Sequence, residues 1–191
     1  MERRRLLYAV AAAGALALAG CTTTGQGVND QTPTERRAKI NAGADDALAR
    51  LYSSVPGARE MGAKARGILI FPQVVSAGFV IGGEYGEGVL RQGGSNNGYY
   101  RVAGGSFGFQ AGAQSRAVII MFMNEAELDR FKNASGWTAG VDGSVAVAKV
   151  GVNGGIDSNT ARAPVVAFAL TNAGLMANLT VQGSKITKLD L

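Results

Sequence analysis

The sequence predicts an α+β fold, mainly β, in which an antiparallel β-barrel or roll carries an N-terminal amphipathic helix and one or two short helices. Five apolar or aromatic-rich runs follow one another between residues 67 and 123, separated by glycine, proline and asparagine, which is typical of antiparallel strands joined by tight loops. A stretch with helical periodicity precedes them, and further strand-like runs follow residue 137. A closed or nearly closed sheet would hold so many strands while leaving few open edges.

The first 20 residues have the layout of a signal peptide. Arginines at positions 3 to 5 precede an apolar run from Leu6 to Leu18, which is too short to span a bilayer as a mature helix. The following Leu18-Ala19-Gly20-Cys21 resembles the bacterial lipoprotein box, in which the cysteine thiol takes a diacylglycerol and the signal is cut before it. We therefore expect Cys21 to be the lipidated first residue of the mature protein. The alternative is an ordinary signal peptide followed by a chance cysteine.

Lipidation would determine where the protein resides, because each buried acyl methylene contributes roughly 0.8 kcal/mol. The lipoprotein resemblance implies a sorting rule in which aspartate after the cysteine retains the protein on the inner membrane. Thr22 stands there instead, so we expect an outer-membrane lipoprotein that faces the periplasm. The predicted organisation is a removed signal peptide at 1–20, an acylated, polar tether at 21–31 and a folded domain at 32–191.

Composition excludes several kinds of chemistry. The chain has no histidine, so Ser-His-Asp catalysis, Cys-His catalysis and His-based zinc sites are not available, and we expect neither a metal nor a cofactor. Removing residues 1–20 takes away three arginines and one glutamate, so the formal net charge falls from +5 to +3. This mild positive charge permits contact with anionic lipid, whereas the lack of a dense basic run argues against nucleic acid.

The folded domain is predicted to begin with a long helix. Thr32-Pro33-Thr34-Glu35 combines a threonine cap, proline at the first helical position and glutamate three residues after the cap, and the helix should run to about Ser53. Its basic residues Arg36, Arg37 and Lys39 form a solvated face or hold the helix against anionic head groups. One buried stripe is expected from the apolar positions Ile40, Ala44, Ala47, Leu48, Leu51 and Val55.

A short second helix at Arg59–Ala65 and then the strands are expected next. Asn124 should cap a further helix that ends near Asn133, and residues 93–98 form the clearest loop. The alternation from Leu175 to Gln182 indicates a strand with one buried face. The predicted strands are Gly67–Phe71, Val74–Ile81, Tyr85–Arg91, Tyr99–Phe109, Arg116–Met123, Val145 with Val147, and Ala163–Leu170.

Four blocks of sequence in the correct order resemble the SYLF domain, a lipid-binding family. They are Ala65–Pro72, Gly78–Leu90, Ser106–Gly112 and Gly174–Gly183, and the resemblance covers roughly residues 34–191. The chain departs from the family pattern at Tyr99-Tyr100-Arg101 and at Asn178. The resemblance implies phospholipid binding, with phosphoinositides as ligands in eukaryotic members, and no known catalytic reaction.

The densest basic cluster of the folded region is Arg59, Lys64 and Arg66, between the short helix and the first strand. Each lysine or arginine beside an anionic membrane contributes about 1 kcal/mol. We expect these three residues, with Arg36, Arg37 and Lys39, to bind phosphoinositide-like or other anionic lipid. The alternative is that they only solvate a helix end.

The sequence therefore predicts a membrane-anchored, non-catalytic lipoprotein whose periplasmic SYLF-like domain binds phospholipid. One alternative is a structural or interaction lipoprotein that binds an envelope protein, or its own copies, through its glycine-rich sheet. Another is an acid–base enzyme that uses Glu84 and Glu87, although their spacing of three residues in a strand need not bring them face to face.

Overall fold

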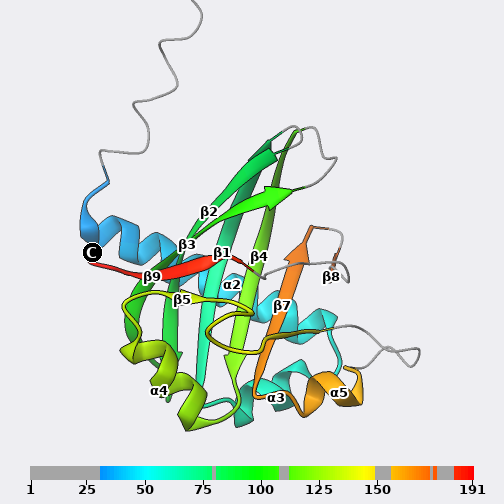
Figure 1. The fold of residues 1–191 in the computed structure, drawn as a ribbon. Coiled ribbons are helices and arrows are strands. Elements are labelled where there is room, and N and C mark those ends of the chain that lie inside the picture. Colours follow the sequence, from blue (N-terminus) through cyan, green and yellow to red (C-terminus); the bar gives the residue numbers. More distant parts are fainter. Residues whose placement is uncertain (1–30, 79–80, 108–111, 149–155, 173, 176–182) are drawn as a thin grey trace, which may run out of the picture. The chain divides into compact units, whose positions relative to one another are not determined.

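The computed structural model describes residues 31–78, 81–107, 112–148, 156–172, 174–175 and 183–191 (Figure 1). The chain divides into two compact units, residues 1–35 and residues 36–191. The predicted signal peptide, Cys21 and most of the predicted tether lie outside the described residues. None of the described helices is both long and apolar enough to cross a membrane.

One curled sheet dominates the second unit (Figure 1). Its strand order is β5-β9-β3-β2-β1-β4-β7-β6, and β8 pairs with β7. Every pair is antiparallel except β6 with β7, which is parallel. The strands are β1 (Gly67–Gly78), β2 (Ile81–Gln92), β3 (Ser95–Phe107), β4 (Gly112–Phe122), β5 (Trp137–Thr138), β6 (Ala146–Val147), β7 (Val165–Thr171), β8 (Gly174–Leu175) and β9 (Lys185–Leu189).

The predicted mainly β, α+β class is confirmed, but the sheet is a half-barrel and not a closed barrel. The path of paired strands ends at β5 and β6, which have two residues each. Very short edge strands limit unwanted pairing without closure. The described helices are α2 (Pro33–Ser54), α3 (Ala58–Lys64), α4 (Glu125–Asn133) and α5 (Ser158–Ala161).

The strand predicted at Gly67–Phe71 and most of the one predicted at Val74–Ile81 form one strand, β1, with a bulge around Pro72, whereas Ile81 begins β2. The register of β1 shifts between Phe71 and Val74 against β4, because proline has no N–H group for the ladder. The bulge brings the backbone of β1 against β2, and a Cβ atom at Gly88 would lie 2.3 Å from the carbonyl oxygen of Ile70. Glycine is therefore required at position 88.

The turn between β2 and β3 is tighter than predicted. Gly93 and Gly94 have φ angles of 56° and 81°, and Ser95 already belongs to β3. The helix predicted after Asn124 is confirmed, since the Asn124 side chain accepts a hydrogen bond from the backbone N–H of Glu127. Most of the alternating run Leu175–Gln182 lies outside the described residues.

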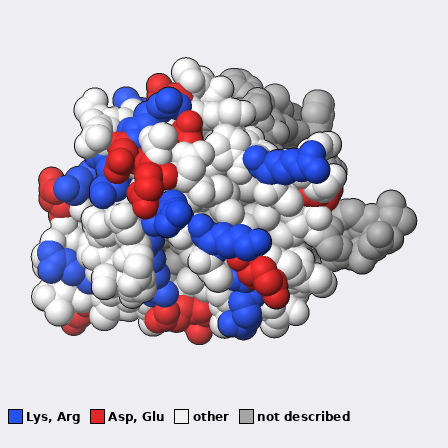
Figure 2. Space-filling view, turned by 90° about the horizontal axis from the view of Figure 1, so that it is seen from below, with Lys and Arg blue, Asp and Glu red and all other residues white. Residues whose placement is uncertain are grey.

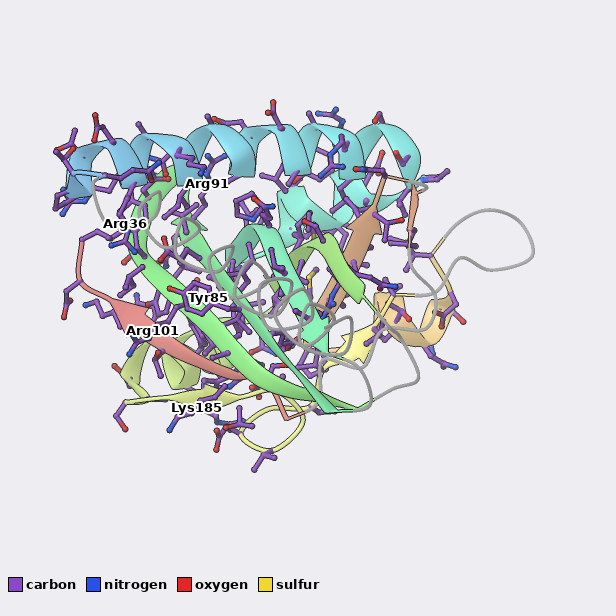
Figure 3. All side chains as sticks on the ribbon, turned by 90° about the horizontal axis from the view of Figure 1, so that it is seen from above. Arg36, Tyr85, Arg91, Arg101 and Lys185 are labelled. Carbon is purple, nitrogen blue, oxygen red and sulfur yellow. The ribbon has the colours of Figure 1, made fainter. Side chains whose placement is uncertain are left out.

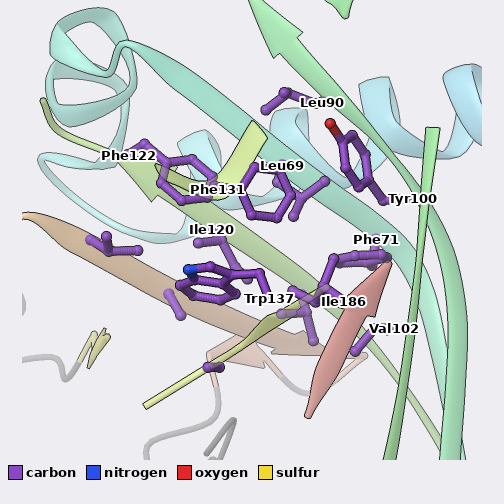
Figure 4. Close-up of a cluster of buried hydrophobic side chains, with 14 of the residues drawn as sticks. Leu69, Phe71, Leu90, Tyr100, Val102, Ile120, Phe122, Phe131, Trp137 and Ile186 are labelled. Carbon is purple, nitrogen blue, oxygen red and sulfur yellow. The ribbon is translucent and has the colours of Figure 1, made fainter. Parts of the chain in front are cut away.

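The inner side of the curled sheet holds one hydrophobic core (Figure 4). Phe131 of α4 lies at its centre, with its ring centroid 4.9 Å from those of Tyr100 and Phe122 and 5.8 Å from that of Trp137. Such aromatic pairs add about 0.5–1.5 kcal/mol each beyond the burial of area. The short α4 therefore stabilises the concave side of the sheet.

The outer side of the sheet holds a second core beneath α2. The predicted stripe of α2 is confirmed, because Ile40, Ala44, Ala47 and Leu51 are buried, Leu48 is half-buried, and Val55, directly after the helix, is also buried. These side chains cluster with Ile70, Val89, Ile119, Met121 and Phe168 of the sheet. The helix begins as predicted, since the Glu35 N–H donates to Thr32 Oγ1 at 3.2 Å and the Thr32 N–H donates to Glu35 Oε2 at 2.8 Å.

Candidate lipid-binding surface

The outer side of the sheet continues past α2 as an exposed surface. Cross-strand pairing places Val75, Tyr85, Ala103 and Lys185 in one row across β1, β2, β3 and β9. A second row places Glu87 opposite Arg101. All of these side chains are exposed except that of Glu87, which is half-buried. We call the surface formed by Val75, Tyr85, Glu87, Arg101, Ala103 and Lys185 the open face.

The open face combines apolar groups with positive charge. Tyr85 is 49% exposed and Val75 is 39% exposed, and both rank among the few large hydrophobic residues exposed in the described structure. Arg101 Nε donates to Thr187 Oγ1 at 3.0 Å, and the ion pairs between described residues include neither Arg101 nor Lys185. Figure 3 shows Arg36, Tyr85, Arg101 and Lys185 following one another from α2 across the sheet.

Glu87 connects the open face to α2. Its Oε1 atom accepts hydrogen bonds from Arg36 Nη2 and from the hydroxyl of Tyr85, the latter at 2.7 Å. Partial burial raises the pKa of Tyr85, and the hydrogen bond and negative charge of Glu87 raise it further, while Arg36 and Arg101 act in the opposite direction. The phenol is therefore neutral near pH 7 and available as a donor.

The six basic residues predicted to bind lipid form two separate groups. Arg36, Arg37 and Lys39 lie in the first two turns of α2, whereas Arg59, Lys64 and Arg66 follow the far end of this helix. Residues 36–54 of α2 alone span about 27 Å at 1.5 Å per residue. Only the first group adjoins the open face, through Arg36.

Several of these cations already have partners. The Arg37 guanidinium lies 5.9 Å from the ring centroid of Tyr99, and that of Arg59 lies 4.9 Å from the ring centroid of Tyr52. Arg66 Nε lies 3.9 Å from Glu125 Oε1, while Lys39 and Lys64 are exposed.

The end of the molecule that carries α3 and α4 has charges of both signs. Figure 2, which views this end from below, shows Asp and Glu side chains among the Lys and Arg side chains. Helix α3 contains Glu60 beside Arg59, and α4 begins with Glu125 close to Arg66. Interspersed carboxylates weaken the attraction of this end for an anionic surface.

Glu84 and Glu87 do not form a catalytic pair. Glu84 lies on the inner side of the sheet, where it is 9% exposed, forms an ion pair with Arg116 and accepts a hydrogen bond from the Ser184 hydroxyl. Glu87 lies on the outer side with Arg36. An odd spacing of three residues places two strand side chains on opposite faces, so the two carboxylates cannot act on one substrate together.

A small cavity lies beside Glu84 and Arg116, and its other walls are mainly apolar side chains of the inner core. Its volume of about 20 Å³ holds roughly one water molecule and no acyl chain. Among the described residues, no three or more carboxylate, cysteine or histidine side chains cluster as metal ligands would. This cavity is therefore too small for a lipid, whereas the open face is an exposed surface that a lipid can reach.

Sequence reasoning missed Val75, Tyr85, Arg101 and Lys185. The alternation of β3 carries a usable signal, because buried Tyr100 and Val102 alternate with exposed Arg101 and Ala103. No local signal joins β3 to β9, since the two strands are distant in the sequence and pair only through the sheet.

The described residues form a mainly β, α+β domain with an exposed face on its sheet. Residues 103–190 match the model of the Ysc84 family, which is described as "Las17-binding protein actin regulator". This part of the chain thus matches the Ysc84 (SYLF) family model, and the resemblance predicted from the sequence is confirmed.

A curated relative supports the same assignment. Beta cell expansion factor A of Aeromonas veronii is 27% identical over 164 residues, which cover 83% of this chain and 59% of the relative. The chain thus spans about three-fifths of the length of that protein. The family is associated with lipid binding and protein interactions.

Proposed function

We propose that this domain binds the surface of anionic phospholipid membranes through the open face, without catalysing a reaction. The observation that carries the proposal is the exposure of Tyr85 and Val75 beside Arg101 and Lys185, two cations outside the ion pairs of the described residues. Membership of the SYLF family supports a lipid-binding or actin-regulator-like domain.

The chemistry of the open face suits the boundary between water and lipid. A tyrosine ring is apolar along its body and polar at its hydroxyl, so it is favoured where one end is in apolar surroundings and the other is hydrated. Each arginine or lysine near an anionic leaflet adds about 1 kcal/mol of attraction, which salt screens within a Debye length of roughly 8–10 Å. Two cations and one aromatic ring thus support weak, salt-dependent binding.

An acyl anchor at Cys21 would make this weak binding effective. A protein already held at the membrane meets its lipid partners at a high local concentration, so a low intrinsic affinity suffices. We propose that the protein is an outer-membrane lipoprotein that carries its SYLF domain on the periplasmic side. Intact-mass analysis of protein from its host tests the anchor, and a mature terminus other than Cys21, or one without lipid mass, would reject it.

The lipid-binding proposal is tested with protein that begins at Thr22, which contains the whole compact unit of residues 36–191. Co-sedimentation with phosphatidylglycerol vesicles should exceed co-sedimentation with phosphatidylcholine vesicles, and added salt should reduce the difference. Equal or absent sedimentation with both would reject membrane binding. That result would favour the alternative role, in which the glycine-rich sheet binds an envelope protein or another copy of the chain.

A further inference from the structure

Two donors from different parts of the fold converge on a single oxygen atom at the border of the open face. Arg36 Nη2 comes from α2 and the Tyr85 hydroxyl comes from β2, and both donate to Oε1 of Glu87. Arg101 is the cross-strand neighbour of Glu87 on β3. A guanidinium and a hydroxyl that share one anionic oxygen, with a second guanidinium nearby, also form a suitable arrangement for a phosphate group.

We propose that Arg36, Tyr85 and Arg101 form a subsite for the phosphate of a lipid head group, and that the Glu87 carboxylate occupies the phosphate position when no lipid is bound. This inference rests on the proposed binding of anionic membranes through the open face. It adds a specific head-group contact to an attraction that is otherwise general. Glu87 then acts as an internal competitor that keeps the affinity low.

The exposure of the participating groups fits this exchange. The side chains of Arg36 and Glu87 are 32% and 21% exposed, so the pair lies at the surface and can open without disrupting a core. Surface ion pairs of this kind contribute little to stability. A membrane phosphate carries the same charge sign as the carboxylate, so Arg36 and Tyr85 remain satisfied when one replaces the other.

The Asp45–Arg91 pair provides a matched control. Arg91 Nη1 lies 2.6 Å from Asp45 Oδ1, so this is also an arginine–carboxylate contact between α2 and β2. The charge of Arg91 acts to lower the pKa of Tyr52, whereas the charges of Arg36 and Arg101 act to lower the pKa of Tyr85. Figure 3 shows Arg91 beside α2, with Arg36 labelled nearer to Arg101. Removing either carboxylate leaves one arginine without its ion-pair partner and raises the net charge by the same amount, although Arg91 still donates to the Asn41 carbonyl oxygen.

The experiment compares Glu87→Gln with Asp45→Asn in the protein that begins at Thr22, using phosphatidylglycerol vesicles at low salt. We expect Glu87→Gln to bind about fivefold more tightly than the parent, which corresponds to about one extra charge at an anionic surface. Asp45→Asn should change the affinity less than about twofold. Equal gains in both variants would overturn the subsite and leave general electrostatics as the cause.

Tyr85→Phe provides a second test without any change of charge, because it removes the hydroxyl and keeps the ring. We expect the affinity for the same vesicles to fall about threefold, in line with the loss of one hydrogen bond to a charged group. An unchanged affinity would overturn the role of the hydroxyl. Thermal melts of each variant confirm that it is folded.

Inorganic phosphate distinguishes a lipid head group from a free anion. Amide NMR shifts of Glu87→Gln should respond to phosphatidylglycerol vesicles and not to inorganic phosphate at matched ionic strength. Saturable shifts with inorganic phosphate alone would overturn the assignment to lipid.

The affinities for vesicles distinguish failure of the subsite from failure of the proposed function. If the parent binds anionic vesicles while Glu87→Gln has the same affinity as Asp45→Asn, only the subsite fails. If the parent shows no preference for anionic vesicles, the proposed function fails first.

Discussion

The outer side of the sheet has two regions that differ in what covers them. Under α2, the strands present Ile70, Val89, Ile119 and Met121, all of which are buried. Further along β1 and β2 on the same side, the open face presents exposed Val75 and Tyr85. The neighbouring strands β3 and β9 add the cations Arg101 and Lys185. The residue types therefore change where the helix stops covering the sheet, and not where a strand begins or ends.

The border between the two regions is polar. On β2, Glu87 occupies the outward-facing position next to the covered Val89. On β3, Arg101 occupies the outward-facing position next to Tyr99. Arg36 reaches from α2 to Glu87 at this border. The difference shows that a single strand can serve the core at one end and a functional surface at the other.

The largest effect that distinguishes the regions should be on stability. Leu51→Ala removes a fully buried side chain of α2 and should lower the free energy of unfolding by about 2–5 kcal/mol, because it leaves a cavity. Tyr85→Ala on the open face should change it by less than about 1 kcal/mol. Urea denaturation of both variants measures the contrast, and similar losses would mean that the open face also packs as core.

The glycines of the sheet should show the next largest contrast. A Cβ atom at Gly88 would lie 2.3 Å from the Ile70 carbonyl oxygen, whereas a Cβ atom at Gly105 would meet nothing within 4 Å. Gly88→Ala should therefore cost at least about 1–3 kcal/mol through backbone strain. Gly105→Ala should remain within about 0.5 kcal/mol of the parent. A tolerated Gly88→Ala would show that the β1 bulge does not press against β2.

The smallest effect concerns the start of α2. Hydrogen bonds from the Thr32 backbone and side chain lower the pKa of Glu35 below its ordinary value of 4.5. A carboxylate whose pKa is lower in the folded state stabilises that state above its unfolded pKa, and the contribution is lost as the pH falls through the folded pKa. Thr32→Ala should return the Glu35 pKa toward its ordinary value in a carboxyl NMR titration. An unchanged pKa would contradict the capping box.

The covered region was predictable from the sequence, and the open face was not. The helical spacing of Ile40, Ala44 and Leu51 predicts the buried stripe because local periodicity determines which side of a helix is apolar. The open face depends on contacts such as that between Arg101 and Thr187, which are 86 positions apart. Their approach is determined by strand register, which no local pattern in the sequence specifies.

The sequence also could not predict whether the sheet closes into a barrel. The strand predicted at Val145 with Val147 overlaps β6, but the two-residue β5 is too short to be recognised by alternation. The parallel pairing of β6 with β7 depends on the path of the chain between them. The closeness of Lys64 and Arg66 in the sequence predicts a basic cluster, but it does not predict that Glu125, which is distant in the sequence, approaches Arg66 from α4.

The most direct comparison uses two double variants that each remove two positive charges. Arg101→Gln with Lys185→Gln changes the open face, whereas Lys64→Gln with Arg66→Gln changes the end that carries α3, and the affinity of each protein for phosphatidylglycerol vesicles is measured at low salt. We expect the first pair to lose roughly thirtyfold in affinity, from about 1 kcal/mol for each charge, and the second to lose less than about threefold. An equal loss in both, or a larger loss in the second, would contradict the assignment of membrane binding to the open face.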